Sequence, residues 1–98
     1  MTIPFAAIKA RVSEGYVLSL CERWLPRGKQ KGSWWIASVP WRKDRKPSLG
    51  VHLDSGNWKD FANPGVAGDI IDLRMRIAHE NNIEAAKAIA VYVGLKLE

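Results

Sequence analysis

The stretch "SVPWRKDRKPSLGV", residues 38–51, decides the fold because it joins two strand-like segments through a basic loop that contains two prolines. The preceding segment, residues 33–39, is rich in aromatic and branched side chains, as β-strands are. The following segment, residues 48–53, alternates, so that its leucines and valine face one way and Gly50 and His52 the other. The loop has four basic residues, one acidic residue, and neither cysteine nor histidine.

Outward from this loop, the sequence predicts one more strand and a set of flanking helices. "DSGN", residues 54–57, is typical of a tight turn, and "WKDF", residues 58–61, of a short third strand. The basic segment 27–32 is interpreted as a turn and residues 62–68 as an irregular loop. Apolar spacing predicts helices over residues 5–12, 17–25, 70–78 and 83–93. We therefore expect an α+β fold: a three-stranded antiparallel sheet flanked by N-terminal and C-terminal helices.

The helix ends have their own signals. Pro4 suits a first helical turn, and Asp69 with Asp72 three positions later is typical of a helix start. Gly94 followed by an apolar residue predicts a Schellman close of the last helix. Cys21 falls inside the apolar stripe of the second helix, so we expect it to be buried.

Length and composition bound the function. The 98 residues predict a single domain, 1–98, and the net charge of +5 favours an acidic partner such as nucleic acid. Of fifteen basic residues, eight lie in one quarter of the chain: Arg23, Arg27, Lys29, Lys31, Arg42, Lys43, Arg45 and Lys46.

A single cysteine excludes an intramolecular disulfide and fits a reducing cytoplasm. No membrane span or signal peptide is recognisable, so a cytoplasmic location is expected.

The ordered set of segments resembles the N-terminal zinc-binding (zinc-ribbon) domain of DnaG-type primases from bacteria, phages and plasmids. In that family, a Cys-Pro-Phe-His box precedes an acidic residue, Pro-Ser and an apolar strand. A second strand ends in Cys-Phe-Gly-Cys, and Gly-Gly-Asp opens a helix. The resemblance covers nearly the whole chain, including "IKARV" at residues 8–12. The matching positions are Pro40, Trp41, Asp44, Pro47, Ser48, Leu49, Val51, Trp58, Phe61, Gly68, Asp69, Ile70, Ile71 and Leu73.

The chain departs from this family at the four metal-ligand positions, which hold Val39, Arg42, Asp60 and Asn63. Only the aspartate is a plausible zinc ligand, and structural zinc sites use four thiolate or imidazole donors. His52 and His79 do not lie at ligand spacing from Cys21 or from each other. We therefore expect a degenerate form of the domain that binds no zinc and no other cofactor.

Loss of zinc removes on the order of 10 kcal/mol of apparent folding energy in small domains, so other contacts must replace it. Arg42 and Asp60 stand where two ligands would converge, and the sequence predicts an ion pair between them, with a hydrogen bond from Asn63. An exposed pair contributes only about 1 kcal/mol. The larger replacement is expected from apolar side chains closing over the site: Val39, Trp41, Trp58 and Phe61.

The resemblance implies a role in DNA replication, in a bacterium or on a mobile element such as a plasmid or phage. The catalytic primase domain is absent from these residues, and no acidic cluster for catalytic Mg²⁺ or phosphate-binding loop is present, so no enzymatic activity is expected. Basic residues interleaved with aromatic ones predict single-stranded DNA binding. The candidate contacts are Lys29, Lys31, Trp34, Trp35, Lys43, Arg45, Lys46 and Lys59.

Two questions stay open at this level. One tryptophan of the adjacent Trp34–Trp35 pair is expected to be buried and the other exposed, without an indication of which. The alternative function is a metal-free adaptor that docks onto a primase, polymerase or helicase protein. Its candidate contacts are Arg74 and Arg76 or the apolar C-terminal end, which comprises Tyr92, Val93 and Leu95.

Overall fold

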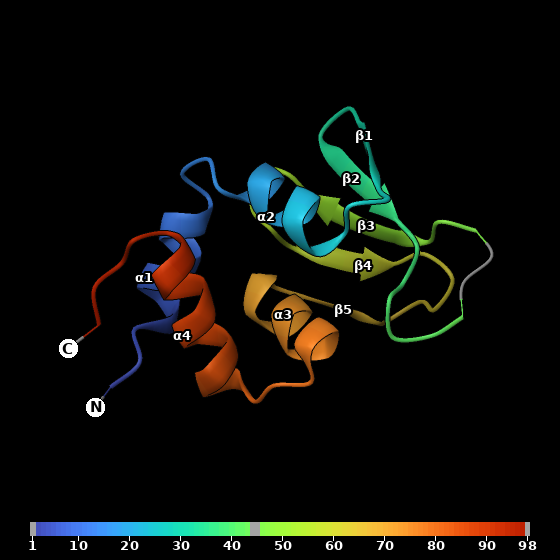
Figure 1. The fold of residues 1–98 in the computed structure, drawn as a ribbon. Coiled ribbons are helices and arrows are strands. Elements are labelled where there is room, and N and C mark those ends of the chain that lie inside the picture. The colour runs from blue at the N-terminus through green and yellow to red at the C-terminus, as the bar shows by residue number, and fades with distance from the viewer. Residues whose placement is uncertain (1, 44–45, 98) are drawn as a thin grey trace.

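The computed structural model describes residues 2–43 and 46–97, and its fold is drawn in Figure 1. Two helices precede five short strands, and two further helices close the chain. In chain order the elements are α1 (Phe5–Val12), α2 (Val17–Trp24), β1 (Lys29–Lys31), β2 (Trp34–Ala37), β3 (Leu49–His52), β4 (Trp58–Asp60), β5 (Ala67–Gly68), α3 (Ile70–Ala78) and α4 (Asn82–Tyr92).

The strands form one antiparallel sheet in the order β1-β2-β3-β4-β5. The three predicted strands are its centre, so the α+β class is confirmed, but the prediction missed both edge strands. The three residues of β1 are polar and exposed, and β5 is only two residues long. Both pair through backbone hydrogen bonds without an apolar side-chain pattern. The interpretation of residues 27–32 as a turn and of 62–68 as wholly irregular was therefore wrong.

The core lies on one face of the sheet, which we call the inner face. Trp35, Val51 and Trp58 point into it and belong to one buried cluster with Leu20 of α2 and Ile70 of α3. At one end of the molecule, α4 packs against both α1 and α3, and the two chain ends lie close to this group (Figure 1). The opposite face of the sheet, the outer face, is thus left for solvent or ligand.

The predicted helix boundaries hold to within one residue. Gly94 adopts a left-handed φ of 71°, and the N–H of Leu95 donates to the carbonyl of Ala90 at 2.9 Å, so the Schellman close of α4 is confirmed. The start of this helix is one residue earlier than expected, because Asn81 and Glu84 form a reciprocal capping box.

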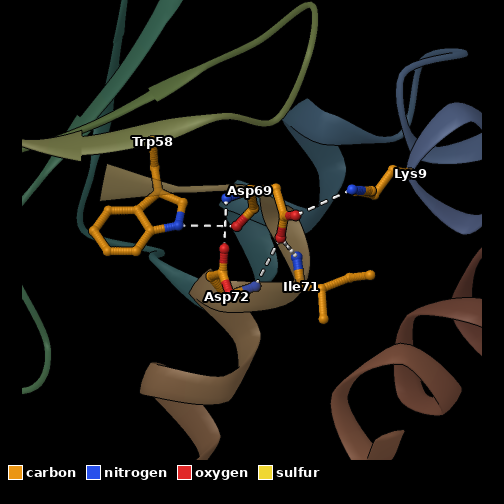
Figure 2. Close-up of polar contacts among 5 residues, drawn as sticks. All are labelled: Lys9, Trp58, Asp69, Ile71 and Asp72. Carbon is orange, nitrogen blue, oxygen red and sulfur yellow. Dashed lines mark hydrogen bonds and ion pairs between the residues drawn. The ribbon is translucent and has the colours of Figure 1, made fainter. Parts of the chain in front are cut away.

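Polar contacts of Asp69 connect β4 of the sheet with α1 and α3, as Figure 2 shows. The indole N–H of Trp58 donates to the Asp69 carbonyl at 2.9 Å, and the Asp69 carboxylate accepts the N–H groups of Ile71 and Asp72, both at 3.0 Å. Lys9 of α1 pairs with the same carboxylate at 3.3 Å. Partial burial raises the pKa of Asp69, but these hydrogen bonds outweigh it and hold the pKa below its ordinary value. The predicted helix start is confirmed.

Candidate nucleic-acid interface

The strand register places basic side chains together on the outer face. Residues directly opposite each other on antiparallel strands point to the same side of the sheet. Lys31 is opposite Trp34, and Lys29 is opposite Ile36 in the same pair of strands. Ile36 is opposite Gly50, which is in turn opposite Lys59. Three of the predicted lysines therefore share one face with Trp34.

The centre of the outer face is an aromatic cluster covered by a lysine. The Lys59 ammonium lies 5.1 Å from the centroid of the Trp34 ring and 5.3 Å from that of Phe61. The Trp34 and His52 rings also meet in a T-shaped arrangement at a centroid distance of 5.0 Å. Trp34 is half-buried, whereas 51% of Phe61 is exposed. Cation–π attraction thus holds a positive charge directly over apolar rings that solvent can reach.

Gly50 makes this arrangement possible. A Cβ at this position would lie 2.7 Å from two Phe61 ring atoms and 3.2 Å from a Trp34 ring atom. The absence of a side chain in the middle of β3 therefore lets both rings lie close over the strand. The two ring centroids are 6.1 Å apart and the ring planes are tilted by 59°, and aromatic rings on a sheet surface are the kind of platform on which unpaired bases stack.

Beside this platform, the outer face is hollowed between β1 and the residues that precede β3. The hollow has a volume of about 280 Å³ and is lined by Arg27, Lys29, Lys31, Ile36 and Pro47. Arg27 was not among the predicted contacts, although its place just before a basic strand is a signal that points to it. The predicted contacts Lys43 and Lys46 are exposed on the loop after β2. Arg45 lies outside the described residues, as does Asp44.

The prediction that Trp35 contacts nucleic acid was wrong. Only 8% of this residue is exposed, and its indole N–H donates to the carbonyl of Leu25 at 3.1 Å. Strand alternation sends it inward once Trp34 points outward. The expectation that one member of the pair is buried is thereby met, but its neighbour is half-buried rather than fully exposed.

Arg42 and Asp60 form the predicted ion pair on the inner side of the sheet. The second NH2 group of the guanidinium donates to the other carboxylate oxygen at 3.1 Å and to the Ser48 hydroxyl at 3.0 Å. The Ala62 N–H and the Asn63 amide donate to the carboxylate at 3.0 and 3.3 Å. The Asp60 side chain is completely buried. Hydrogen bonding from Arg42 is the main cause that lowers its pKa to about 2.

The side chains at the four metal-ligand positions do not fit the zinc ion of the family that the sequence resembles. Val39 has no donor atom, Arg42 carries a positive charge, and the one carboxylate already accepts hydrogen bonds from Arg42, Ala62 and Asn63. In residues 2–43 and 46–97, no three His, Cys, Asp or Glu side chains come together in a way that could hold a metal ion.

The apolar side chains predicted to close over this site do so with one exception. Val39 is buried, and the rings of Trp41 and Trp58 meet at a centroid distance of 5.4 Å. Arg76 lies 5.3 Å from both ring centroids. Phe61 is the exception: Asp60 points inward, so the next residue points outward, where it joins the platform instead. The strand alternation, with Trp58 and Asp60 inward and Lys59 outward, is the signal that indicates this outward position.

Of the residues predicted for an adaptor role, Arg74 and Tyr92 line one hollow between the helices, whereas Arg76 lies against the Trp41 and Trp58 rings. Arg74 is bound to Glu80 at 2.7 Å, which lowers the pKa of that glutamate, and Val93 is fully buried. Val93 therefore cannot contact a partner, because its side chain completes the packing of α4 on the core.

Cys21 is also buried, and desolvation, aided by the charge of Glu22, raises its thiol pKa to about 12. Across the described residues, no helix is long and apolar enough to span a membrane.

Comparison with known proteins identifies the fold. The crystal structure of the Aquifex aeolicus primase, comprising its zinc-binding and RNA polymerase domains, superimposes with a TM-score of 0.79 and 23% sequence identity. The match covers all of this chain and 23% of the Aquifex chain. No protein-family model matches the sequence, and no curated protein matches it. The protein thus has an α+β fold similar to that of a primase zinc-binding domain.

Proposed function

We propose that the protein is a nucleic-acid-binding module of a replication or primase system, and that it holds single-stranded DNA across the outer face of its sheet. The observation that carries this proposal is the position of the Lys59 ammonium over Trp34 and Phe61. Positive charge and aromatic surface at one place are the two elements that single-strand binders combine. The primase-related fold is consistent with a partner of this kind.

In this proposal, phosphates contact the lysines and bases stack on the rings. From β1 to β4 the sheet spans three strand spacings, about 14 Å, so a chain running across the strands passes from Lys31 over Trp34 to Lys59. Stacking contributes about 1–3 kcal/mol per base and requires an unpaired base, which favours a single strand over a duplex. Lys43 and Lys46 extend the basic surface at one side.

The proposal includes a structural part. Val39, Arg42, Asp60 and Asn63 replace the metal ligands of a primase-type domain, with hydrogen bonds and packing in place of zinc. The module is non-catalytic in this view and acts by binding. Arg42 then serves stability, and the nearby lysines serve the ligand.

Fluorescence anisotropy with a labelled oligothymidylate, run beside a duplex of equal length, tests the proposal. We expect tighter binding to the single strand. Phe61→Ala should weaken it by about 1–3 kcal/mol, because an exposed stacking ring is removed without loss of core packing. Lys59→Ala should also reduce the slope of log K against log[salt] by about 0.7, the value for one phosphate contact on a single strand.

Lys87→Ala is the matched control, because this lysine is exposed on α4, away from the sheet. It should leave affinity and salt slope nearly unchanged. No binding at low salt, or equal losses for Lys59→Ala and Lys87→Ala, would refute the proposed interface. Absence of binding would instead favour the adaptor function.

A further inference from the structure

A second recessed surface begins between the helices and continues beside Trp24 to the end of β2. One hollow of about 360 Å³ runs between α2, α3 and α4, and its lining residues are Leu20, Arg23, Trp24, Arg74, Ala88, Val91 and Tyr92. Another, of about 380 Å³, adjoins it across Trp24 and is lined further by Leu25, Pro26, Arg27, Gly28, Ala37, Ser38 and Pro40. We call the two together the helical groove.

The groove combines aromatic rings with arginines. The Arg23 guanidinium lies 5.6 Å from the centroid of the Tyr92 ring, and that of Arg74 lies 5.8 Å from the Trp24 ring. No aspartate or glutamate lines either hollow. Among the described residues, Arg74 pairs with Glu80, whereas neither Arg23 nor Arg27 forms an ion pair. The groove is therefore positively charged and retains two arginines whose charge is not compensated.

Apolar side chains stand exposed at its rim. Val91 has 80% of its surface exposed and Tyr92 has 37%, both at the end of α4. Exposed apolar residues rimmed by polar ones mark interaction sites, and tryptophan, tyrosine and arginine are the residues that contribute most at protein interfaces. The pattern here is an apolar strip bordered by cations.

We propose that the helical groove binds a short acidic peptide segment of a partner protein. Its apolar side chains contact Val91 and Tyr92, and its carboxylates pair with Arg23 and Arg27. Charge complementarity selects an acidic partner, since only arginines border the strip. A peptide suits the site better than a nucleic acid, because Leu20, Ala88 and Val91 give it an aliphatic lining on which apolar side chains can pack.

Apart from Arg27, which lines both the groove and the hollow beside the platform, the two surfaces share no residue, so both ligands can be bound at once. The groove extends from the helices to the segment between α2 and β1 and to the end of β2, whereas the platform lies on the outer face of the sheet. The protein would then connect a DNA strand to a second protein. This inference does not depend on the DNA-binding proposal, because none of the residues that carry it belongs to the platform.

The test uses the indole N–H signals of the ¹⁵N-labelled protein, assigned with Trp24→Phe and Trp34→Phe. The probe is a short synthetic peptide in which aspartates alternate with leucine and phenylalanine. We expect this peptide to shift the Trp24 signal and leave the Trp34 signal in place. An oligothymidylate should do the reverse. A peptide with lysines in place of the aspartates should leave the Trp24 signal unchanged.

Val91→Asp should weaken peptide binding about tenfold or more, because it places a carboxylate where the acidic peptide docks. The exposure of Val91 makes loss of the fold unexpected. Lys59→Glu is the control: it should preserve peptide binding and impair oligothymidylate binding. Four outcomes would each overturn the proposal. These are equal losses of peptide affinity in the two variants, a shift of the Trp34 indole signal by the peptide, displacement of the peptide by the oligonucleotide, and no peptide binding.

Discussion

Replacing Arg42 by alanine tests whether the ion pair with Asp60 stabilises the loop that joins β2 to β3. The Asp60 side chain is completely buried, and 29% of the Arg42 side chain is exposed. After the replacement, the buried carboxylate keeps only the hydrogen bonds from the Ala62 N–H and the Asn63 amide. A negative charge would then lie in the protein interior without a cation beside it.

Two routes give the size of the effect. Breaking an ion pair costs about 3–5 kcal/mol when it is buried and below about 1 kcal/mol when it is exposed, so this pair of intermediate exposure should fall near 2–3 kcal/mol. The pKa of Asp60 falls from its ordinary value of 3.8 to about 2. At about 1.4 kcal/mol per pKa unit, this difference corresponds to about 2 kcal/mol at neutral pH.

The sign of the pH dependence follows from that pKa. The folded protein holds the carboxyl ionised more strongly than the unfolded chain does, so the stabilisation is complete above about pH 4 and is lost as the pH falls towards 2. At about pH 3, roughly half of the contribution should remain. The free-energy difference between wild type and Arg42→Ala should shrink accordingly.

Urea unfolding followed by tryptophan fluorescence measures this difference. At pH 7 the midpoint for Arg42→Ala should be lower by about 1–2 M, given the slopes usual for small domains. Lys43→Ala, at the next and exposed position, is the control and should change stability by less than about 0.5 kcal/mol. An equally small change for Arg42→Ala, or the same loss at pH 3 and pH 7, would refute the reasoning.

Three further substitutions test the packing and the helix ends. Gly28→Ala would place a Cβ 2.2 Å from the indole nitrogen of Trp35, so we expect a loss of about 2–3 kcal/mol in thermal or urea unfolding; an unchanged midpoint would contradict the packing. His79→Gly should raise stability by about 0.5–1 kcal/mol, because His79 has a left-handed φ of 55°, and a lowered melting temperature would argue against this. Asn81→Ala should lower the free energy of unfolding by about 1 kcal/mol, because it removes the side-chain oxygen that accepts the Glu84 N–H at 2.8 Å. Asn81→Asp should keep this hydrogen bond and leave the stability nearly unchanged.

Much of the fold could be predicted from side-chain patterns, and the errors of that prediction have a common cause. Strands β3 and β4 alternate apolar with other residues, so the sequence indicates both their positions and their faces, whereas β2 is apolar throughout and its sequence indicates its position alone. The edge strands β1 and β5 have no such pattern, because an edge strand pairs through its backbone and needs no buried side chain. Sequence periodicity therefore misses strands of this kind.

The candidate site was harder to predict, because a residue belongs to it only if its side chain points to the outer face. The direction of each side chain depends on the contacts that its neighbours in the strand make. Trp34 and Trp35 are chemically identical, and only tertiary contacts decide between them. Here, the carbonyl of Leu25 and the space at Gly28 receive the Trp35 indole, which leaves Trp34 on the outer face. Propensity is the same for both residues, so no local rule distinguishes them.

The basic cluster that dominates the sequence is divided among several roles by the fold. Arg42 turns inward to Asp60, Lys31 lies on the outer face, and Arg23 lies over Tyr92 on the helices. Net charge therefore overstates the surface available to any one ligand. It follows that substitutions of equal charge should separate by position: Arg42 should affect folding, Lys31 oligonucleotide affinity, and Arg23 peptide affinity. A uniform loss of DNA binding in proportion to charge removed would show instead that the fold does not partition the cluster.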